Sequence, residues 1–300
     1  MDIINWIVNY RRFLKRRNYS DHTVRNYMST LRRFALWLDV PIEEATNKKI
    51  LQYIDYLLDY GLQPKTINSH LDSIRGFYEY LRDVENMTIQ NPVKRGYALR
   101  LSRPLPRYLR DEEVEKLFAV IRKPRDRAIF MLMLRCGLRV EEVADLTIRA
   151  MDLKRRKMAV EEGKGGKGRV VYISHDALDA LAEYLRVRPS SMVKNIFLVE
   201  KGPYSGKAIS VRGIQKRMEY YAKKAGLKVS SHQLRHTMAT QLLNADADLV
   251  TIQDLLGHSR IKTTQRYCQV SNLKVQRDYF KAMVVVMKRT TLDNRIHSGS

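Results

Sequence analysis

The sequence predicts a mainly helical protein with one small β-sheet, built as two domains. The chain has 300 residues, of which 44% are hydrophobic and 29% charged, a globular composition and a length sufficient for two cores. Apolar residues recur at helical spacing through most of the sequence, and strand-like patterning is confined to "KMAVEEGKGGKGRVVYI" (157–173). A basic stretch with two prolines, residues 94–108, separates the two predicted domains.

Residues 1–93 are predicted to form an all-helical domain. In residues 20–38 the apolar side chains recur every three or four positions, and Ser20 is a suitable N-cap. A second helix is expected to end near Gly61, and a third to begin with Pro64 in its first turn. We find no alternating pattern typical of strands in this part of the sequence.

The segment 94–108 is predicted to be an extended linker, because it contains Pro104 and Pro106 and lacks helical periodicity. It contains no acidic residue, so it could lie along a phosphate backbone or be a solvated tether. Its candidate backbone contacts are Lys94, Arg100, Arg103 and Arg107.

A second, mixed domain is predicted over residues 109–282, followed by a C-terminal tail, 283–300. The glycine-rich stretch "GKGGKGR" is expected to turn between two short strands. The last predicted helix ends in a run of apolar residues. We expect these residues to be buried, either against their own domain or against a neighbouring molecule. Helices are predicted over 111–121, 125–137, 176–187, 211–226, 230–245, 249–257 and 274–287.

Charge indicates a polyanionic partner. The chain carries 55 Lys and Arg against 32 Asp and Glu, a net charge of +23 and a pI near 10. Residues 1–98 hold 15 basic and 11 acidic side chains, whereas residues 99–300 hold 40 and 21, so most of the excess lies in the second part. Nucleic acid is the commonest partner for such a chain, although a basic protein of another class has the same composition.

The sequence offers no feature of a membrane or disulfide-stabilised protein. The longest apolar run, residues 128–134, is too short to cross a bilayer, and the N-terminus does not resemble a signal peptide. Cys136 and Cys268 match no zinc spacing and are too few for a disulfide framework. We therefore expect a cytoplasmic protein with free thiols.

The stretch "SSHQLRHTMAT" places His232, Arg235 and His236 on one face of a helix. Such a face could bind a metal, grip a phosphate or be ordinary solvated surface. The zinc motif H-E-x-x-H has a glutamate as general base, but this chain has Gln233 there, which disfavours the metal.

Further residues follow a specific order along the chain. Arg139 stands at a helix start after a glycine, and Lys164 and Lys167 lie in the predicted hairpin turn. The "HQLRH" motif comes next, then Gly257 and His258, and nine residues later Tyr267. This order resembles the tyrosine recombinase (phage integrase) family, in particular its Xer-like members, and more distantly the type IB topoisomerases. The pattern Ser20, Thr23 and Tyr27 is similar to the opening of that family's core-binding domain.

The resemblance implies a C-shaped clamp on DNA and a phosphoryl-transfer site that needs no cofactor, metal or ATP. Two arginines would bind the non-bridging oxygens, and Tyr267 would attack phosphorus to leave a 3′-phosphotyrosine. His232 would be the general base, and Lys164 would protonate the leaving 5′-oxygen. The implied catalytic residues are Arg139, Lys164, His232, Arg235, His258 and Tyr267. Glu142 and His236 are expected to support them, and Lys167 and Arg169 are further candidates for contact with the DNA backbone.

The partner implied by the resemblance is double-stranded DNA, bound by a homo-tetramer on paired sites, with a monomer or dimer possible without DNA. Chromosome dimer resolution and integration or excision of a mobile element both fit this prediction. DNA relaxation by the same chemistry and catalytically silent DNA binding remain the alternatives.

Overall fold

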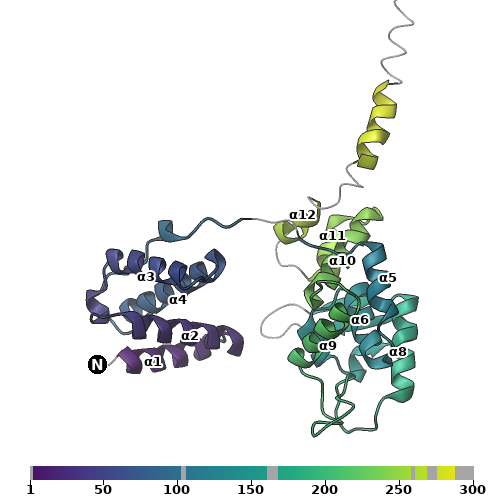
Figure 1. The fold of residues 1–300 in the computed structure, drawn as a ribbon, viewed down its shortest axis with the longest axis horizontal. Coiled ribbons are helices and arrows are strands. Elements are labelled where there is room, and N and C mark those ends of the chain that lie inside the picture. The colour runs from purple at the N-terminus through teal and green to yellow at the C-terminus, as the bar shows by residue number, and fades with distance from the viewer. Residues whose placement is uncertain (1–2, 103–105, 161–167, 258–260, 269–275, 288–300) are drawn as a thin grey trace, which may run out of the picture. The chain divides into compact units, whose positions relative to one another are not determined.

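The chain folds into two compact units, Met1–Arg103 and Pro104–Ser300, shown in the computed structural model of Figure 1. The structure describes residues 3–102, 106–160, 168–257, 261–268 and 276–287. No helix within these ranges has the length and apolarity needed to cross a membrane.

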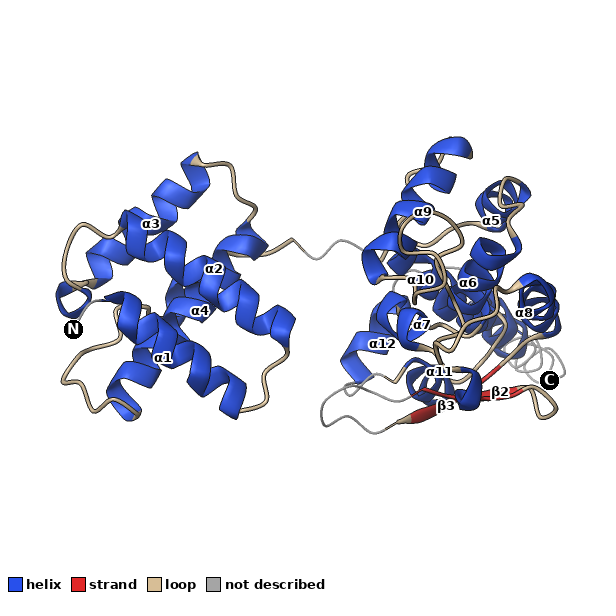
Figure 2. Cartoon of the chain, turned by 90° about the horizontal axis from the view of Figure 1, so that it is seen from below, coloured by secondary structure: helices blue, strands red, loops and turns tan. Residues whose placement is uncertain are grey.

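The first unit is a four-helix assembly in which α4 packs against the other three helices (Figure 2). Ser20 begins α2 as predicted, since its hydroxyl accepts a hydrogen bond from the Thr23 N–H at 3.1 Å. Gly61, with φ +78°, follows α3 in the left-handed region that favours glycine. No strand occurs in residues 3–102, so the predicted helical character of this part is confirmed. Its elements are α1 (Ile3–Arg16), α2 (Asp21–Trp37), η1 (Ile42–Glu44), α3 (Asn47–Asp59), α4 (Pro64–Asp83) and η2 (Arg95–Tyr97).

The basic segment is anchored at both ends. The Asn68 side chain donates to the Leu99 carbonyl (2.9 Å) and accepts from the Leu99 N–H (2.8 Å), which ties residues up to Leu99 to α4. The Leu109 N–H donates to the Thr237 hydroxyl at 2.9 Å inside the second unit. Arg100 and Arg107, between these anchors, are exposed.

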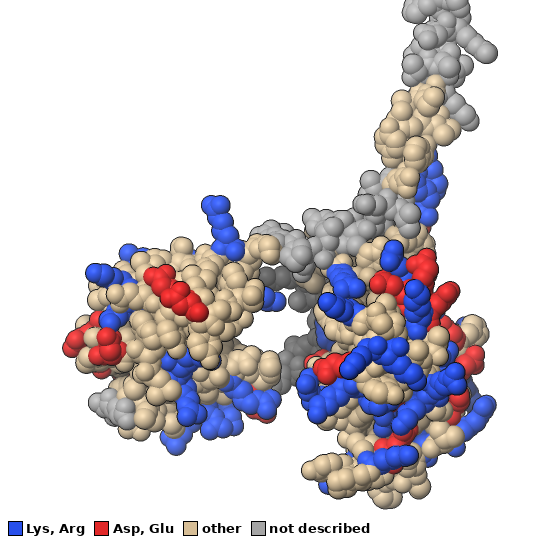
Figure 3. Space-filling model, in the orientation of Figure 1, with Lys and Arg blue, Asp and Glu red and all other residues tan. Residues whose placement is uncertain are grey.

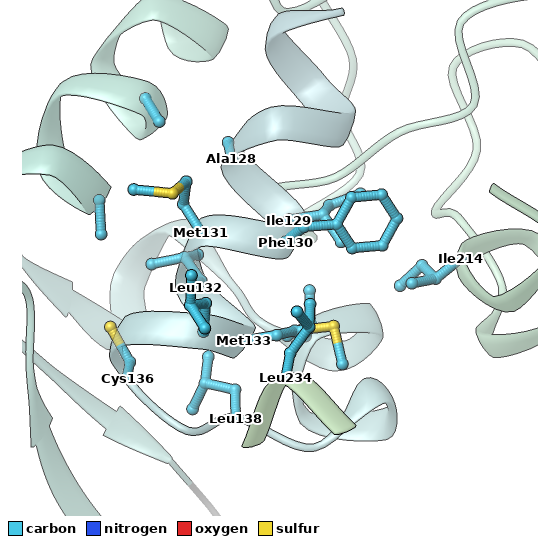
Figure 4. Packing of buried hydrophobic residues seen from close by; sticks show 14 of the residues in the cluster. Ala128, Ile129, Phe130, Met131, Leu132, Met133, Cys136, Leu138, Ile214 and Leu234 are labelled. Carbon is cyan, nitrogen blue, oxygen red and sulfur yellow. The ribbon is translucent and has the colours of Figure 1, made fainter. Parts of the chain in front are cut away.

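The second unit is built around α6, whose residues 128–134 are all buried. Helices α7, α8, α9 and α10 pack against it, which explains why this helix is apolar on every side (Figure 4). Its helices are α5 (Asp111–Ala119), α6 (Pro124–Arg135), α7 (Val140–Asp145), η3 (Ile148–Ala150), α8 (His175–Val187), α9 (Val211–Lys224), α10 (Ser231–Asn244), α11 (Leu249–Leu256) and α12 (Ile261–Cys268).

An antiparallel sheet of order β1-β2-β3 completes the unit, with β1 (Met151–Asp152), β2 (Lys157–Val160) and β3 (Arg169–Tyr172). Strands β2 and β3 confirm the predicted pair, and β1 extends it by one short strand. Val160 pairs with Arg169, so the predicted glycine-rich turn falls between two paired strand residues. The turn, with Lys164 and Lys167, lies outside the described residues.

Residues 276–287 are helical, as the sequence predicts. Arg277 connects this helix to the end of α10 by donating to the Asn244 carbonyl (3.3 Å) and to the Asp246 carboxylate. Met283 of this helix is partly buried, but six other large apolar side chains are at least half exposed: Tyr279, Phe280, Val284, Val285, Val286 and Met287.

Candidate active site

The C-terminus of α11 collects three arginines on three successive backbone carbonyls. Gly257 adopts φ +62° and closes the helix in a left-handed cap. The last carbonyls of a helix lack intrahelical partners and carry the negative end of its dipole, so they attract cations. Arg169 Nε donates to the Leu255 carbonyl (2.8 Å), Arg235 to that of Leu256, and Arg139 to that of Gly257 (3.5 Å).

Arg235 is the most deeply buried of the three, with 1% of its surface exposed. Its guanidinium also donates to the carbonyl of Gly137 in the turn before α7. Burial and the nearby charge of Arg139 lower the pKa of Arg235 to about 10, which leaves it protonated at neutral pH. Two carbonyls therefore fix the plane of this guanidinium.

Glu142 links two of these arginines. Its carboxylate accepts from the Arg139 guanidinium (2.7 Å) and backbone N–H (2.8 Å), and from both terminal nitrogens of Arg169 (2.8 Å each). Burial alone would raise the pKa of Glu142, but the hydrogen bonds and charges of Arg169 and Arg139 lower it to about 2. The Glu142 carboxylate thus bridges Arg139 and Arg169.

The contacts of Arg169 correct one prediction. The sequence places Arg169 among the candidate DNA backbone contacts, but its side chain is 7% exposed and pairs with Glu142 and the end of α11. A buried charge needs a partner of opposite charge, and Arg169 has one in Glu142. This arginine therefore stabilises the interior of the site. It connects the base of the β2–β3 hairpin to Arg139.

We predict that Glu142→Gln lowers stability at neutral pH, and that the deficit shrinks in acid. The pKa of Glu142 lies near 2 in the folded chain, below its ordinary value of 4.5. The ionised carboxylate therefore stabilises the fold above about pH 4.5, and this contribution is lost as the pH falls from about 4.5 to about 2. Thermal unfolding of both proteins at several pH values measures the effect. The exposed neighbour Glu141 offers a control, since the unfolding temperature of Glu141→Gln should match that of the wild type at every pH. A stability deficit of Glu142→Gln that stays the same at every pH would contradict the prediction.

Tyr267 reaches the site from α12 and is almost fully buried, with 2% of its surface exposed. Its hydroxyl is 2.7 Å from Nδ1 of His236, and the His236 ring packs edge-on against His232 at 4.4 Å between centroids. Partial burial and the charges of Arg235 and Arg139 lower the pKa of His232, which favours its neutral form. The two imidazoles therefore lie next to each other, and one of them contacts the tyrosine.

A groove of about 580 Å³ opens beside these histidines. Its lining includes His232, His236, Gln233, Arg107 and Lys228. Lysine and arginine side chains also cover much of the visible face of the second unit (Figure 3). Val229 adds an apolar side chain to this lining. The cationic and hydrogen-bonding groups suit a phosphate ester.

Seven of the predicted side chains thus share one region: Arg139, Glu142, Arg169, His232, Arg235, His236 and Tyr267. Lys164, Lys167, His258 and Arg103 lie outside the described residues. Sequence reasoning did not find the carbonyl ligands of the arginines or Lys228 in the groove. Backbone acceptors leave no residue-type signal, and Lys228 is one of many lysines.

Comparison with known proteins covers both units. The phage integrase family matches residues 107–274, and the N-terminal SAM-like domain of phage integrases matches residues 6–86. The tyrosine recombinase XerC of Staphylococcus haemolyticus is 32% identical over 277 residues, which cover 89% of this chain and 92% of the relative. The tyrosine recombinase XerA of Thermococcus kodakarensis is 31% identical, with 93% and 95% covered.

Solved structures share the fold. The Tn1549 transposon integrase in complex with transposon right end DNA superposes with a TM-score of 0.79 at 17% identity, over 95% of this chain and all of that one. The XerH site-specific recombinase bound to a palindromic difH substrate gives a TM-score of 0.73 at 20% identity, over 88% and 80%.

Proposed function

This chain belongs to the phage integrase family of tyrosine recombinases, and from that premise we propose how it acts: it cleaves and rejoins DNA at a specific site through a 3′-phosphotyrosyl intermediate. One observation carries the proposal. A buried tyrosine, Tyr267, lies beside a pair of imidazoles and a guanidinium, Arg235, that two backbone carbonyls hold in place. Such an arrangement supplies a nucleophile and preorganised phosphate donors in one place.

In the proposed reaction, Arg139 and Arg235 bind the non-bridging oxygens of the scissile phosphate, where charge accumulates in the transition state. The Tyr267 oxygen attacks phosphorus, and the 5′-oxygen leaves with a proton from Lys164. His258 is proposed as a further phosphate ligand, because it follows Gly257 at the end of α11. The covalent bond to tyrosine conserves the phosphoester, so rejoining requires no external energy source.

The experiment that tests the proposal uses a duplex carrying the recognition site with a nick close to the scissile phosphate. Cleavage releases a short fragment, which traps the protein on DNA. The wild-type protein should give a band of reduced mobility that survives denaturing detergent and disappears on protease treatment. A relaxation enzyme would form the same adduct, but it would not exchange strands between two duplexes that each carry the site. Selection from genomic fragments would supply the site, since specificity rests on a few base contacts.

The proposed role of Lys164 predicts rescue by sulfur. Lys164→Ala should be slow on normal DNA, but close to the wild-type rate when the bridging 5′-oxygen is replaced by sulfur. The leaving group is then a thiolate, whose conjugate thiol has a pKa of about 8.5, so it leaves without needing a proton. Single-turnover cleavage of both substrates measures this. Lys167→Ala is the matched control from the same turn, and rescue of that variant in place of Lys164→Ala would assign the acid to Lys167.

Double-stranded DNA is the proposed partner. Most of the net positive charge lies in residues 99–300, and the exposed Arg100 and Arg107 lie between the two anchors of the basic segment. We propose phosphate contacts for these two residues, and for Lys94, Arg103 and Lys167. We also propose that the protein acts in the cytoplasm, where it would resolve chromosome dimers or move a mobile element.

Four copies are proposed to assemble on paired sites, with the helix 276–287 contacting a neighbouring copy. Its exposed apolar side chains support this, since such residues favour burial. Deleting residues 282–300 should therefore spare DNA binding and cleavage of a single site but abolish recombination between two sites. Full recombination by the shortened protein would contradict the proposal and favour docking within one chain.

A further inference from the structure

The hydroxyl of Tyr267 is held by a histidine outside the set implied by the family resemblance. His236 Nδ1 lies 2.7 Å from the phenol oxygen, and the two ring centroids are 5.5 Å apart. His236 projects from α10 and Tyr267 from α12, two helices that pack against each other. The contact therefore belongs to the tertiary structure of the second unit.

The surroundings keep this contact in place. Tyr267 packs in a small apolar cluster with Met238, Leu243, Ile252 and Leu256, which fixes its ring. His236 is half-buried, and its ring packs against the His232 ring with an interplanar angle of 75°. The phenol oxygen and the imidazole nitrogen thus meet through two constrained side chains.

The two imidazoles have different neighbours. His232 lies on the side of the arginines, since the charges of Arg235 and Arg139 act on it. His236 instead contacts the nucleophile. A base whose accepting atom lies within about 2.6–3.2 Å of the atom that carries the proton meets the geometric requirement for general base catalysis.

Building on the proposed function, we infer that His236 Nδ1 takes the phenolic proton of Tyr267 as the tyrosine attacks phosphorus. In this step the Tyr267 oxygen–phosphorus bond forms and the phosphorus–5′-oxygen bond breaks. The phenolic proton moves to His236, and the 5′-oxygen receives a proton from the acid proposed at Lys164. In rejoining, His236 returns its proton to the tyrosine oxygen. His232 is then left to hydrogen-bond the phosphate.

Most of the charges near the pair are cationic. The groove next to His232 and His236 is lined by Arg107 and Lys228, and the charges of Arg139 and Arg235 act on His232. Glu141 is the acidic group that acts on His232, while the Glu142 carboxylate is occupied by Arg139 and Arg169. As phosphorus bonds to the phenol oxygen, the phenol becomes more acidic and its proton passes to the imidazole.

The test compares His236→Asn with the wild type. Asparagine can place a polar atom close to the position of Nδ1, so it keeps a hydrogen bond to Tyr267 but cannot take a proton. Single-turnover adduct formation on the nicked duplex is followed from about pH 5.5 to about pH 9, the range in which histidine titrates. The wild-type rate should fall toward acid as His236 becomes protonated. His236→Asn should be slower by about a hundredfold or more and should lose this acid limb.

Two further measurements separate a base from a merely structural residue. Imidazole added to His236→Gly should restore part of the rate, because it can occupy the vacated space and accept the proton. The 5′-sulfur substrate should not rescue His236→Asn, because the defect lies at the nucleophile and not at the leaving group. DNA affinity and the thermal unfolding midpoint of each variant check that the site remains folded.

The outcomes are distinct. A slow His236→Asn that retains the acid limb and resists imidazole rescue would reduce His236 to a positioning residue and overturn the inference. If the limb disappears instead in His232→Asn, the base is His232. Failure of the wild type to form any adduct would refute the proposed function itself.

Discussion

Tyr267→Phe is expected to form no covalent adduct with DNA at any pH and on either the oxygen or the sulfur substrate. The phenol oxygen is the proposed nucleophile, and phenylalanine removes it while filling almost the same volume. Tyr267 is buried within an apolar cluster, so its ring should still pack and DNA binding should persist. Gel shift measures binding, and denaturing electrophoresis measures the adduct.

A second buried tyrosine provides the control. The Tyr184 hydroxyl donates to the Ile196 carbonyl at 3.2 Å, within the core of the same unit. Tyr184→Phe should cost about 1 kcal/mol of stability and leave adduct formation intact. An adduct formed by Tyr267→Phe would show that another residue attacks the phosphate.

Arg235→Ala should slow cleavage by about a hundredfold to a thousandfold, the loss measured when one preorganised transition-state donor is removed. The defect should persist on the sulfur substrate, because the non-bridging oxygens are unchanged. Arg235→Lys should recover little, since an ammonium cannot satisfy the carbonyls of Gly137 and Leu256 and still present a planar fork to the phosphate.

Because removing a buried arginine leaves carbonyls unpaired, the comparison needs a variant with the same structural cost. Arg188 also donates to backbone carbonyls, those of Ile196 and Asn195 at 2.8 Å each. Arg188→Ala should lower stability and leave the cleavage rate near that of the wild type. Equal loss of rate in Arg188→Ala and Arg235→Ala would assign the effect to folding.

Much of this architecture could be predicted because the local signals are strong. The caps at Ser20 and Gly61, the apolar run of α6 and the alternation around the hairpin each act within a few residues. By contrast, α12 has no predicted counterpart. It is short and polar, and its burial comes from Thr264 and Tyr267, which face other helices. Periodicity detects a helix with an apolar face, and this helix has little of one.

The residues of the candidate site also divide into those that the sequence could predict and those that only the tertiary structure brings together. Residue type and order mark Arg139, Arg235 and Tyr267, since the chemistry demands guanidiniums and a phenol. The contact between His236 and Tyr267 joins positions 31 residues apart, and only the packing of α10 on α12 creates it. The burial of Arg169 is similar, because its partners Glu142 and Leu255 come from two other elements.

The turn at Gly137 limits how this protein can be evolved in the laboratory toward new target sequences. Its φ is +64°, and an added Cβ would lie 2.9 Å from Leu256 and 3.1 Å from Met238. Its carbonyl orients Arg235, so a side chain here would displace the guanidinium without touching DNA. Libraries of random substitutions will therefore contain variants that still bind their DNA sites but no longer cleave them. Diversity is better kept away from Gly137 and from the Leu256 and Met238 side chains beside it, so that the interior of the site stays intact.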